Sequence, residues 1–417
     1  MSEKKCLMKL LENTNLSKSE RKRYLAGILP YNAALYEVRQ SFIHEQVYLD
    51  NVQVYHRIKS HEAYKALPAK VSNQVLIQLH KAWVAFFEAM EAWQACPEKF
   101  TGRPQLPKYK HKSDGRNLLV YEQGAISKRA LKRGMLAPSG LGMEVKTAQT
   151  AVKQARIVPR SGFYVVEVVY EKAVKQAEVN PAYYAGIDLG VNNLVALTSN
   201  KPKFQSVIIN GRPVKSINQF YNKRRAALQK QLGKTGTTKR MERLTTTRNR
   251  RIEHYMHTAS KRIVDLLVKE GIGTLVIGKN DGWKQESNIG KRNNQNFVSI
   301  PHARLIAMLT YKAELVGITV KVTEESYTSK ASLLDLDPLP VRKDGDDTKH
   351  TFSGKRVERG LYRAANGREI NADINGAGNT IRKVAPDAFG TEGVEDCAVH
   401  PVRIVVPRTK ETKNVAN

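Results

Sequence analysis

The spacing of apolar residues predicts that the first part of the chain is helical. Residues 14–95 place apolar side chains at helical intervals, most clearly in KVSNQVLIQLHKAWVAFFEAMEAW, residues 70–93. Ser72 is the predicted N-cap of this helix. We therefore expect a mainly helical region over residues 1–112, whose core-facing stripe is Val75, Leu76, Leu79, Trp83, Phe86, Phe87, Met90 and Trp93.

Strands are predicted over residues 113–178. The run RIVPRSGFYVVEVVYEK indicates a hairpin that turns at Ser161 and Gly162, and its alternating residues share one face. A small β-barrel or sheet is therefore expected here, with the polar stretch KQAEVNPAYY as the linker that follows.

From residue 179 onwards the pattern changes to that of an α/β domain. Three short runs, YYAGIDLG, NLVALTSN and FQSVIING, predict an antiparallel meander. A basic helical hairpin over residues 213–270, a strand TLVIG, a helix from Pro301, a strand ITVKVT and a helix from Asp373 follow. This order is that of the RNase H fold. The predicted fold class is multi-domain α+β, with an RNase H-like domain after a helical region and a small β-barrel region.

The remaining domain boundaries are expected in the second half of the chain. The RNase H-like domain is expected in two parts, residues 179–327 and 371–390, separated by an insert over residues 328–370. Residues 391–417 are expected to form a partly disordered tail, in which VRIVV could add an edge strand.

Positive charge dominates the composition. Lys and Arg number 69 against 39 Asp and Glu, which gives a net charge of +30. Self-repulsion of this size favours a polyanionic partner, and nucleic acid is the expected one. No apolar stretch of about 20 residues and no signal-peptide core occurs, so we expect a cytoplasmic protein with no membrane partner. Cys6, Cys96 and Cys397 are too far apart for a CxxC pair or a disulfide framework and are read as reduced.

Three carboxylates stand where a nuclease of this fold needs them: Asp188 in GIDLGVNN, Glu325 in VTEESYTSK and Asp373 in NADINGAGN. Hydrolysis of a phosphodiester by two divalent ions needs carboxylates that hold the metals about 3.5–4 Å apart. The alternative roles are structural: Asp188 precedes the turn glycine Gly190, and Asp373 stands where a helix cap is common.

The second carboxylate is the difficult assignment. Relatives of this architecture often end the fourth strand with a glutamate, but here Gly278 ends TLVIG. Glu324 and Glu325 end the next strand, about 4.8 Å further out, and a glutamate could cross that gap if Gly278 leaves room. Glu325 is preferred because it directly precedes the SYTSK turn, Glu324 is the alternative, and Asp335 and Asp337 are outside candidates.

Basic residues define candidate nucleic-acid contacts. In KFTGRPQLPKYKHK the prolines stop helix formation while cations alternate with aromatic rings, a composition suited to a nucleic-acid strand, although a solvated linker is the alternative. The candidates there are Lys99, Arg103, Lys108, Tyr109, Lys110 and Lys112, and elsewhere Arg224, Arg225, Arg248, Arg250, Arg251, Lys284, Lys330, Lys355 and Arg356.

At these residues the chain resembles the transposon-encoded TnpB family, the ancestors of the type V CRISPR effector nucleases. The similar stretches follow the family's order from about residue 68 to 385: LPAKVSNQV, FTGRPQLPKYK, GIDLGVNNLVAL, IGKNDGWKQ, NNQNFVSIPHARL, ESYTSKASLLD, FSGKRVERGLYR and INADINGAGN.

The resemblance implies an RNA-guided DNA endonuclease. Such a protein binds a guide RNA from the transposon end and cuts double-stranded target DNA beside a short target-adjacent motif at one RuvC-like site. Asp188 and Asp373 match the first and third catalytic acids, and Glu325 resembles the relocated second acid of one branch. The implied cofactor is Mg²⁺, as two ions, with Mn²⁺ as a substitute. The implied location is the prokaryotic cytoplasm, in association with the nucleoid, as a monomer or a dimer.

The resemblance also implies roles for the other regions. The helical region would be a recognition region for the guide–target heteroduplex, and the β region a wedge that grips RNA and helps to read the motif. Most members carry two CxxC pairs in the insert, but here Ser332 stands at the first cysteine position and residues 328–372 contain no cysteine. Four cysteines signal structural zinc, so no zinc is expected in this degenerate zinc-finger-like insert.

Three other functions fit parts of this sequence. A guide-RNA-dependent repressor that binds DNA without cutting is the main alternative, and Gly278 is the residue that favours it. An actin-like ATPase also begins with GIDLG, but the chain has no second GIDLG-like or GGxG segment. A transposase that joins DNA ends shares the fold but not these motifs.

Overall fold

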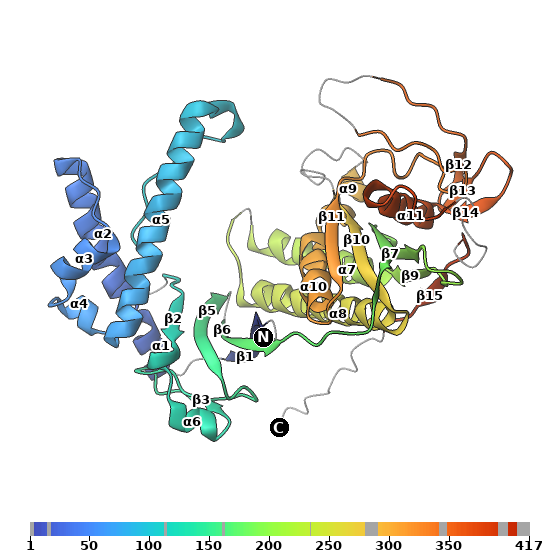
Figure 1. Ribbon diagram of the computed structural model, residues 1–417. Helices are drawn as coiled ribbons and strands as arrows, with labels where there is room; N and C mark the ends of the chain where they lie inside the picture. The colour runs from blue at the N-terminus through green and yellow to red at the C-terminus, as the bar shows by residue number, and fades with distance from the viewer. Residues whose placement is uncertain are drawn as a thin grey trace. The chain divides into compact units, whose positions relative to one another are not determined.

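The computed structural model describes residues 4–14, 18–111, 115–160, 163–233, 235–279, 291–341, 348–390 and 399–406 (Figure 1). The chain divides between Ala173 and Val174 into two compact units, called unit 1 and unit 2. Each unit has hydrophobic cores of its own. The architecture is a multi-domain α+β fold, as the sequence predicts.

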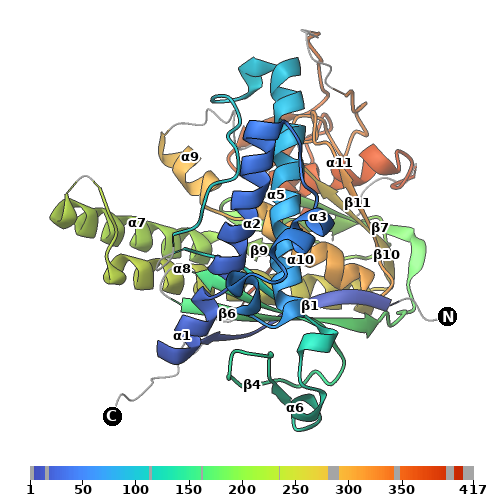
Figure 2. The same cartoon turned by 90° about the vertical axis from the view of Figure 1, so that its left-hand side faces the viewer.

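Unit 1 combines a bundle of helices with a sheet. Figure 2 shows α2 and α5 side by side in this bundle. Its helices are α1 (Lys18–Leu25), α2 (Ile28–Gln40), the π-helix η1 (Ser41–Glu45), α3 (Asn51–Ile58), α4 (Glu62–Lys65), α5 (Ala69–Ala95) and the 3-10 turn η2 (Pro97–Lys99).

Helix α5 begins one turn earlier than the sequence predicts. Pro68 precedes its first residue, and Ser72 lies inside the helix, where its buried hydroxyl donates to the carbonyl of Tyr64 at 2.7 Å. The predicted stripe is fully buried only in the first half of the helix, at Val75, Leu76, Leu79 and Trp83, and is partly exposed at Phe86, Phe87, Met90 and Trp93.

The sheet of unit 1 is antiparallel with the order β1-β6-β5-β2. Helices and strands share one core, because Tyr24 and Trp83 of the helical part and Tyr121 of the sheet belong to one buried cluster. The regions predicted separately as 1–112 and 113–178 therefore pack together, and residues 4–14 form a strand rather than part of the helical region. The elements are β1 (Lys4–Thr14), β2 (Leu119–Glu122), η3 (Gln123–Ala125), α6 (Lys128–Lys132), β3 (Met135–Leu136), β4 (Val145–Lys146), β5 (Val152–Arg160) and β6 (Phe163–Ala173).

Unit 2 is built on a six-stranded sheet with the order β11-β10-β7-β8-β9-β15. The first three strands in sequence are an antiparallel meander, β10 and β11 run parallel to β7, and β15 runs parallel to β9. β15 lies within VRIVV and forms an edge of the sheet, as expected from the sequence. The strands are β7 (Asn180–Leu189), β8 (Asn193–Ser199), β9 (Val207–Asn210), β10 (Ile272–Gly278), β11 (Thr319–Thr323) and β15 (Val402–Ile404).

Helices cover both faces of this sheet. One core joins α8 and α10 to Ile187, Val195 and Leu275, and another joins α11 to Ala196 and Ile208. Because neighbouring strand residues point to opposite faces, α11 lies on the face of Asp188. The helices are α7 (Arg212–Leu232), α8 (Lys239–Lys269), α9 (Lys291–Val298), α10 (His302–Glu314) and α11 (Ala372–Val384), and none of the described helices is long and apolar enough to cross a membrane.

The insert folds around a buried carboxylate. Asp337 is 5% exposed and accepts hydrogen bonds from the backbone N–H groups of Ser332 at 2.8 Å and Ser353 at 3.0 Å and from the Ser353 hydroxyl at 2.5 Å. Asp335 accepts one from the N–H of Ala365 at 3.0 Å. Asp335 and Asp337 therefore hold the insert together. From the sequence alone, they are outside candidates for the second site carboxylate. Its strands are β12 (Lys355–Glu358), β13 (Leu361–Arg363) and β14 (Glu369–Asn371).

Candidate active site

Asp188 lies near the end of β7, the central strand beside β10. Its neighbours Ile187 and Leu189 point into the core under the sheet, so Asp188 points to the α11 face. A Cβ atom added to Gly376 of α11 would lie 3.1 Å from Oδ2 of Asp188, which shows how closely the helix backbone approaches the carboxylate.

The carboxyl of Asp188 is held in an unfavourable electrostatic environment. Burial raises its pKa well above the ordinary value, and the nearby carboxylates of Glu325 and Asp373 raise it further. Arg356 and the backbone N–H of Leu189 act in the opposite direction but do not outweigh these effects. Glu325 and Asp373 are thus both within electrostatic reach of Asp188.

Glu325 follows β11, which is one strand further from β7 than the usual position. Gly278 pairs with Thr323 at this edge, and a Cβ atom on Gly278 would lie 2.6 Å from Cγ and 2.8 Å from Cδ of Glu325. The glutamate side chain therefore fills the space that a side chain at residue 278 would occupy. Burial and the neighbouring Glu324 raise the pKa of Glu325 to about 7.

Glu324 points to other partners. Its Oε1 accepts a hydrogen bond from the ammonium of Lys383 in α11, and its Oε2 accepts one from the N–H of Ser326 at 2.6 Å. Burial alone would raise the pKa of Glu324, but these hydrogen bonds outweigh it and lower the pKa. Of the two alternatives, only Glu325 is among the groups that raise the pKa of Asp188.

Asp373 lies in the first turn of α11 but does not cap it. The N-cap is Asn371, whose side chain accepts from the N–H groups of Asp373 at 3.1 Å and Ile374 at 3.2 Å. Oδ2 of Asp373 instead accepts from the side-chain amide of Asn193 at 2.7 Å, and Arg356 lies 4.0 Å from Oδ1. Asn193 was missed by sequence reasoning, although it belongs to the GVNN stretch that follows Asp188.

The donor set suits a hard cation. Asp188, Glu325 and Asp373 offer carboxylate oxygens, the ligands that Mg²⁺ prefers together with waters and phosphate oxygens. Among the described residues, no three His, Cys, Asp or Glu side chains already stand in a metal-holding arrangement. Asp188, Glu325 and Asp373 are the residues that would hold the metal.

Glu325 should make metal binding depend on pH. Below about pH 7 its carboxyl is protonated in the metal-free protein, so a divalent cation must displace a proton, and affinity should fall about tenfold per pH unit. Since the folded pKa is raised, the folded state binds more protons between its ordinary pKa and about 7, and metal-free protein loses stability as pH rises through this window. Thermal melts should show Glu325→Gln more stable than the parent at about pH 8 but not at about pH 5. An equal effect at both values would contradict the shift.

Two asparagines of α11 fix the turn that follows Glu325. Asn375 accepts from the N–H of Leu333 at 2.8 Å and donates to the carbonyl of Ala331 at 2.8 Å, and Asn379 donates to Thr328 at 3.0 Å and Ala331 at 2.8 Å. Both side chains are fully buried.

Removing the Asn375 amide should be costly. Asn375→Ala leaves the buried N–H of Leu333 unpaired, whereas the carbonyl of Ala331 keeps its bond from Asn379, so the free energy of unfolding should drop by about 1–3 kcal/mol in denaturant titrations. The matched control is Asn366→Ala, which removes a hydrogen bond to Arg368 from an exposed turn and should change stability by less than about 0.5 kcal/mol. Equal losses of unfolding free energy in the two variants would show that the hydrogen bonds of Asn375 contribute nothing special to stability.

The predicted nucleic-acid contacts fall into two groups. Two differ from the expectation: Lys110 and Arg248 are turned inward. The Lys110 ammonium donates to the side chain of Asn117 at 2.6 Å, and burial lowers its pKa to about 8. Arg248 donates to Asn218 and to the carbonyl of Ser299, both at 2.7 Å. Exposed side chains are Lys99, Arg103, Lys108, Tyr109, Arg224, Arg225, Arg250, Arg251, Lys330, Lys355 and Arg356, whereas Lys112 and Lys284 lie outside the described residues.

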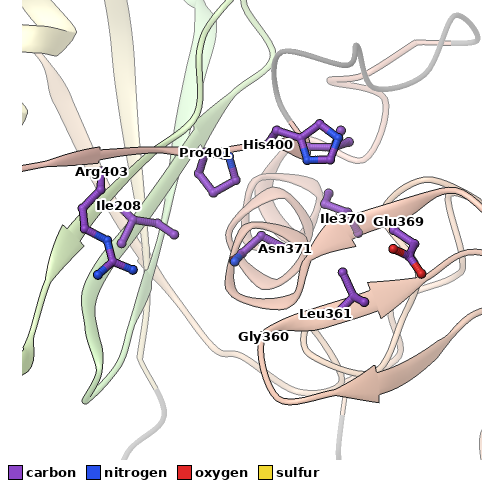
Figure 3. A pocket seen from close by; sticks show the side chains of 10 residues that line it. Ile208, Gly360, Leu361, Glu369, Ile370, Asn371, His400, Pro401 and Arg403 are labelled. Atoms are coloured by element: carbon purple, nitrogen blue, oxygen red, sulfur yellow. The ribbon is translucent and has the colours of Figure 1, made fainter.

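A cavity of about 340 Å³ lies elsewhere in unit 2, between β15 and the insert (Figure 3). Its walls include Asn371, His400 and Arg403, and its carboxylate, Glu369, pairs with Arg363 at 2.7 Å. None of the three predicted acids lines it, so the cavity is not the site that they form.

Comparisons with known proteins bear on the same segments. A family described as "Probable transposase" (OrfB_IS605) matches residues 167–284, and one described as "Cas12f1-like, TNB domain" matches residues 302–380. The TnpB-like protein ORF457 of Acidianus two-tailed virus is 23% identical over 394 residues, which cover 85% of this chain and 80% of the viral protein. The CRISPR-associated endodeoxyribonuclease Cas12f1 of Sulfoacidibacillus thermotolerans is 31% identical over 124 residues, or 30% of this chain and 25% of that protein.

Among solved structures, the cryo-EM structure of a Cas12f1–sgRNA–target DNA complex matches with a TM-score of 0.49 and 14% identity, covering 87% of this chain and 81% of the other. The two matched family segments contain all three acids: Asp188 lies in the first, and Glu325 and Asp373 lie in the second.

Proposed function

The chain belongs to the TnpB family, which is related to the type V CRISPR effectors, and from this premise we propose that it is an RNA-guided DNA endonuclease. It would bind a guide RNA from the end of a transposon and cleave matched DNA beside a short target-adjacent motif. The observation that carries the proposal is the meeting of Asp188, Glu325 and Asp373 on the α11 face of the sheet.

The topology of unit 2 supports an RNase H-like, RuvC-type domain. An antiparallel three-stranded meander followed by two parallel strands on the side of β7 puts Asp188 at the centre of the sheet. The acid after the fifth strand and the acid on the last helix then reach the same face. An actin-like ATPase would instead need phosphate-binding loops where these acids lie, so the arrangement favours a nuclease.

The three acids support metal-dependent hydrolysis. Asp188, Glu325 and Asp373 would hold two Mg²⁺ ions, which activate water and stabilise the leaving oxygen when bound. The protein's own part is to orient the acids: Asn193 holds Asp373, Gly376 lets α11 approach Asp188, and Gly278 gives room to Glu325. The insert, held by Asp337, would need no zinc.

Exposed cations support nucleic acid as the partner. Helices α7 and α8 form a hairpin with a basic surface. Arg224, Arg225 and Lys230 are exposed on α7, and Lys239 and Arg243 are exposed on α8. Such a surface attracts phosphates regardless of sequence. Base pairing with the guide would then supply the sequence discrimination. Lys99, Arg103 and Lys108 offer a similar surface on unit 1.

The decisive experiment begins with protein purified from cells that carry its native flanking DNA. The co-purifying RNA is sequenced, and the complex is given a plasmid library with Mg²⁺. Cleavage of matched plasmids beside one short motif would establish the guided nuclease. Tight binding to matched DNA without cleavage in Mg²⁺ or Mn²⁺ would favour the guided repressor, and the absence of a defined RNA would refute guided recognition.

A further inference from the structure

A buried lysine at the end of α11 has no role in the chemistry proposed so far. The Lys383 side chain is 5% exposed, and its ammonium donates to Oε1 of Glu324 and to the carbonyl of Pro340, the latter at 2.8 Å. A lysine is rarely buried unless it is paired, because its desolvation is costly. Its position therefore depends on the carboxylate of Glu324.

Glu324 is fixed from both sides. Lys383 holds Oε1, and the N–H of Ser326 holds Oε2 at 2.6 Å, so the side chain spans the backbone of residue 325. Glu324 and Glu325 follow the end of β11 at Thr323. Holding the Glu324 side chain and the N–H of Ser326 therefore fixes the chain on either side of Glu325, whose side chain fills the space beside Gly278.

One stripe of α11 contacts the positions of all three acids. Asp373, Gly376 and Lys383 recur at helical spacing and lie along the same side of the helix. The first is itself an acid, the second packs against Asp188, and the third holds the residue beside Glu325. The helix thus sets the three carboxylates relative to one another.

We propose that Lys383 is a positioning residue, whose ion pair with Glu324 directs Glu325 into the metal site from a strand that does not adjoin β7. Because β10 ends in Gly278 and offers no carboxylate, the second acid comes from the segment after β11. The ion pair holds that segment so that Glu325 can still reach the site. The inference rests on the proposed function for its consequence in cleavage, but metal binding by the protein alone tests it separately.

The test compares Lys383→Met, Glu324→Gln and the double variant with the parent. Mn²⁺ binding to the metal-free protein is measured by titration without nucleic acid, and the Mg²⁺ concentration for half-maximal cleavage is measured on the guided complex. Each single variant should weaken Mn²⁺ binding and raise the half-maximal Mg²⁺ concentration by about tenfold, the scale of lost outer-sphere partners of metal ligands. The double variant should be no worse than the worse single one, because both remove the same interaction.

The matched control is Lys261→Met, which removes an exposed pair with Asp265 and changes the net charge by the same amount. It should leave Mn²⁺ binding unchanged. Lower melting temperatures of the Lys383 and Glu324 variants with unchanged Mn²⁺ affinity would show a merely structural pair and overturn the proposal. If the parent binds Mn²⁺ and the variants lose affinity while no protein cleaves DNA, the positioning role stands and the nuclease proposal fails.

Discussion

Asp188→Asn is expected to abolish DNA cleavage and, at the same time, to raise the melting temperature of the metal-free protein. Cleavage should fall by at least about 1,000-fold, or roughly 4 kcal/mol of transition-state stabilisation, because an amide cannot replace a carboxylate that holds metal. Stability should increase because burial and the charges of Glu325 and Asp373 oppose ionisation of Asp188 in the folded state. Each kcal/mol recovered should raise the melting temperature by roughly 2–4 °C for a domain of this size.

Three measurements separate these effects. Single-turnover cleavage reports the loss of chemistry, and thermal melts with and without Mg²⁺ report the stability. Binding of the co-purified RNA should stay within about twofold, because α8 packs on the face of the sheet opposite to Asp188. Asp265→Asn serves as the control, since Asp265 is an exposed acid whose loss should alter neither cleavage nor stability by more than about 0.5 kcal/mol. Cleavage at the parental rate would refute the assignment of Asp188.

Moving the second acid back by one strand should restore activity that its removal abolishes. Glu325→Gly alone should reduce cleavage by at least about 1,000-fold. Gly278→Glu alone should also be harmful, because a Cβ atom at residue 278 would stand 2.6 Å from Cγ of Glu325. The double variant removes this clash and returns a carboxylate to β10, which adjoins β7.

We expect the double variant to recover cleavage to within about 30-fold of the parent, measured as single-turnover rates at saturating Mg²⁺. Such rescue is a strong test, because two individually inactivating changes would rarely combine favourably unless they share one space. Gly102→Ala is a suitable control, since a Cβ atom there would meet nothing within 4 Å and the variant should behave as the parent. A double variant as inactive as Glu325→Gly would show that the two positions are not interchangeable.

Much of unit 2 could be predicted from the sequence because its strands carry clear signals. The runs around Asp188 alternate between core-facing and α11-facing positions, and short turns join them, so the meander and the face of Asp188 follow from the pattern. The room that Gly278 gives to Glu325 was also predictable, because a glycine has no side chain to fill it. What the pattern could not decide was whether Glu324 or Glu325 faces the acids, since this depends on Lys383, 59 positions away from Glu324.

Other features depended on tertiary contacts that local patterns do not contain. The strand formed by residues 4–14 pairs with β6, whose partner residues lie about 150–170 positions later in the chain. Lys110 and Arg248 resemble surface cations in sequence, but hydrogen bonds to Asn117, Asn218 and Ser299 turn them inward. Charge alone therefore does not tell which of these cations the fold leaves exposed.

The role of α11 as the element that joins the acids has a consequence for the timing of synthesis. Asp188 leaves the ribosome long before Asp373 does, because 373 − 188 = 185 residues separate them. At about 5–20 residues per second, the chain is extended for roughly 10–40 s with an incomplete set of acids. Unit 1, which has its own core within the first 173 residues, can fold during this interval. On the proposed function, a nascent chain, or a product truncated before Ala372, would therefore lack one of the acids that cleavage requires.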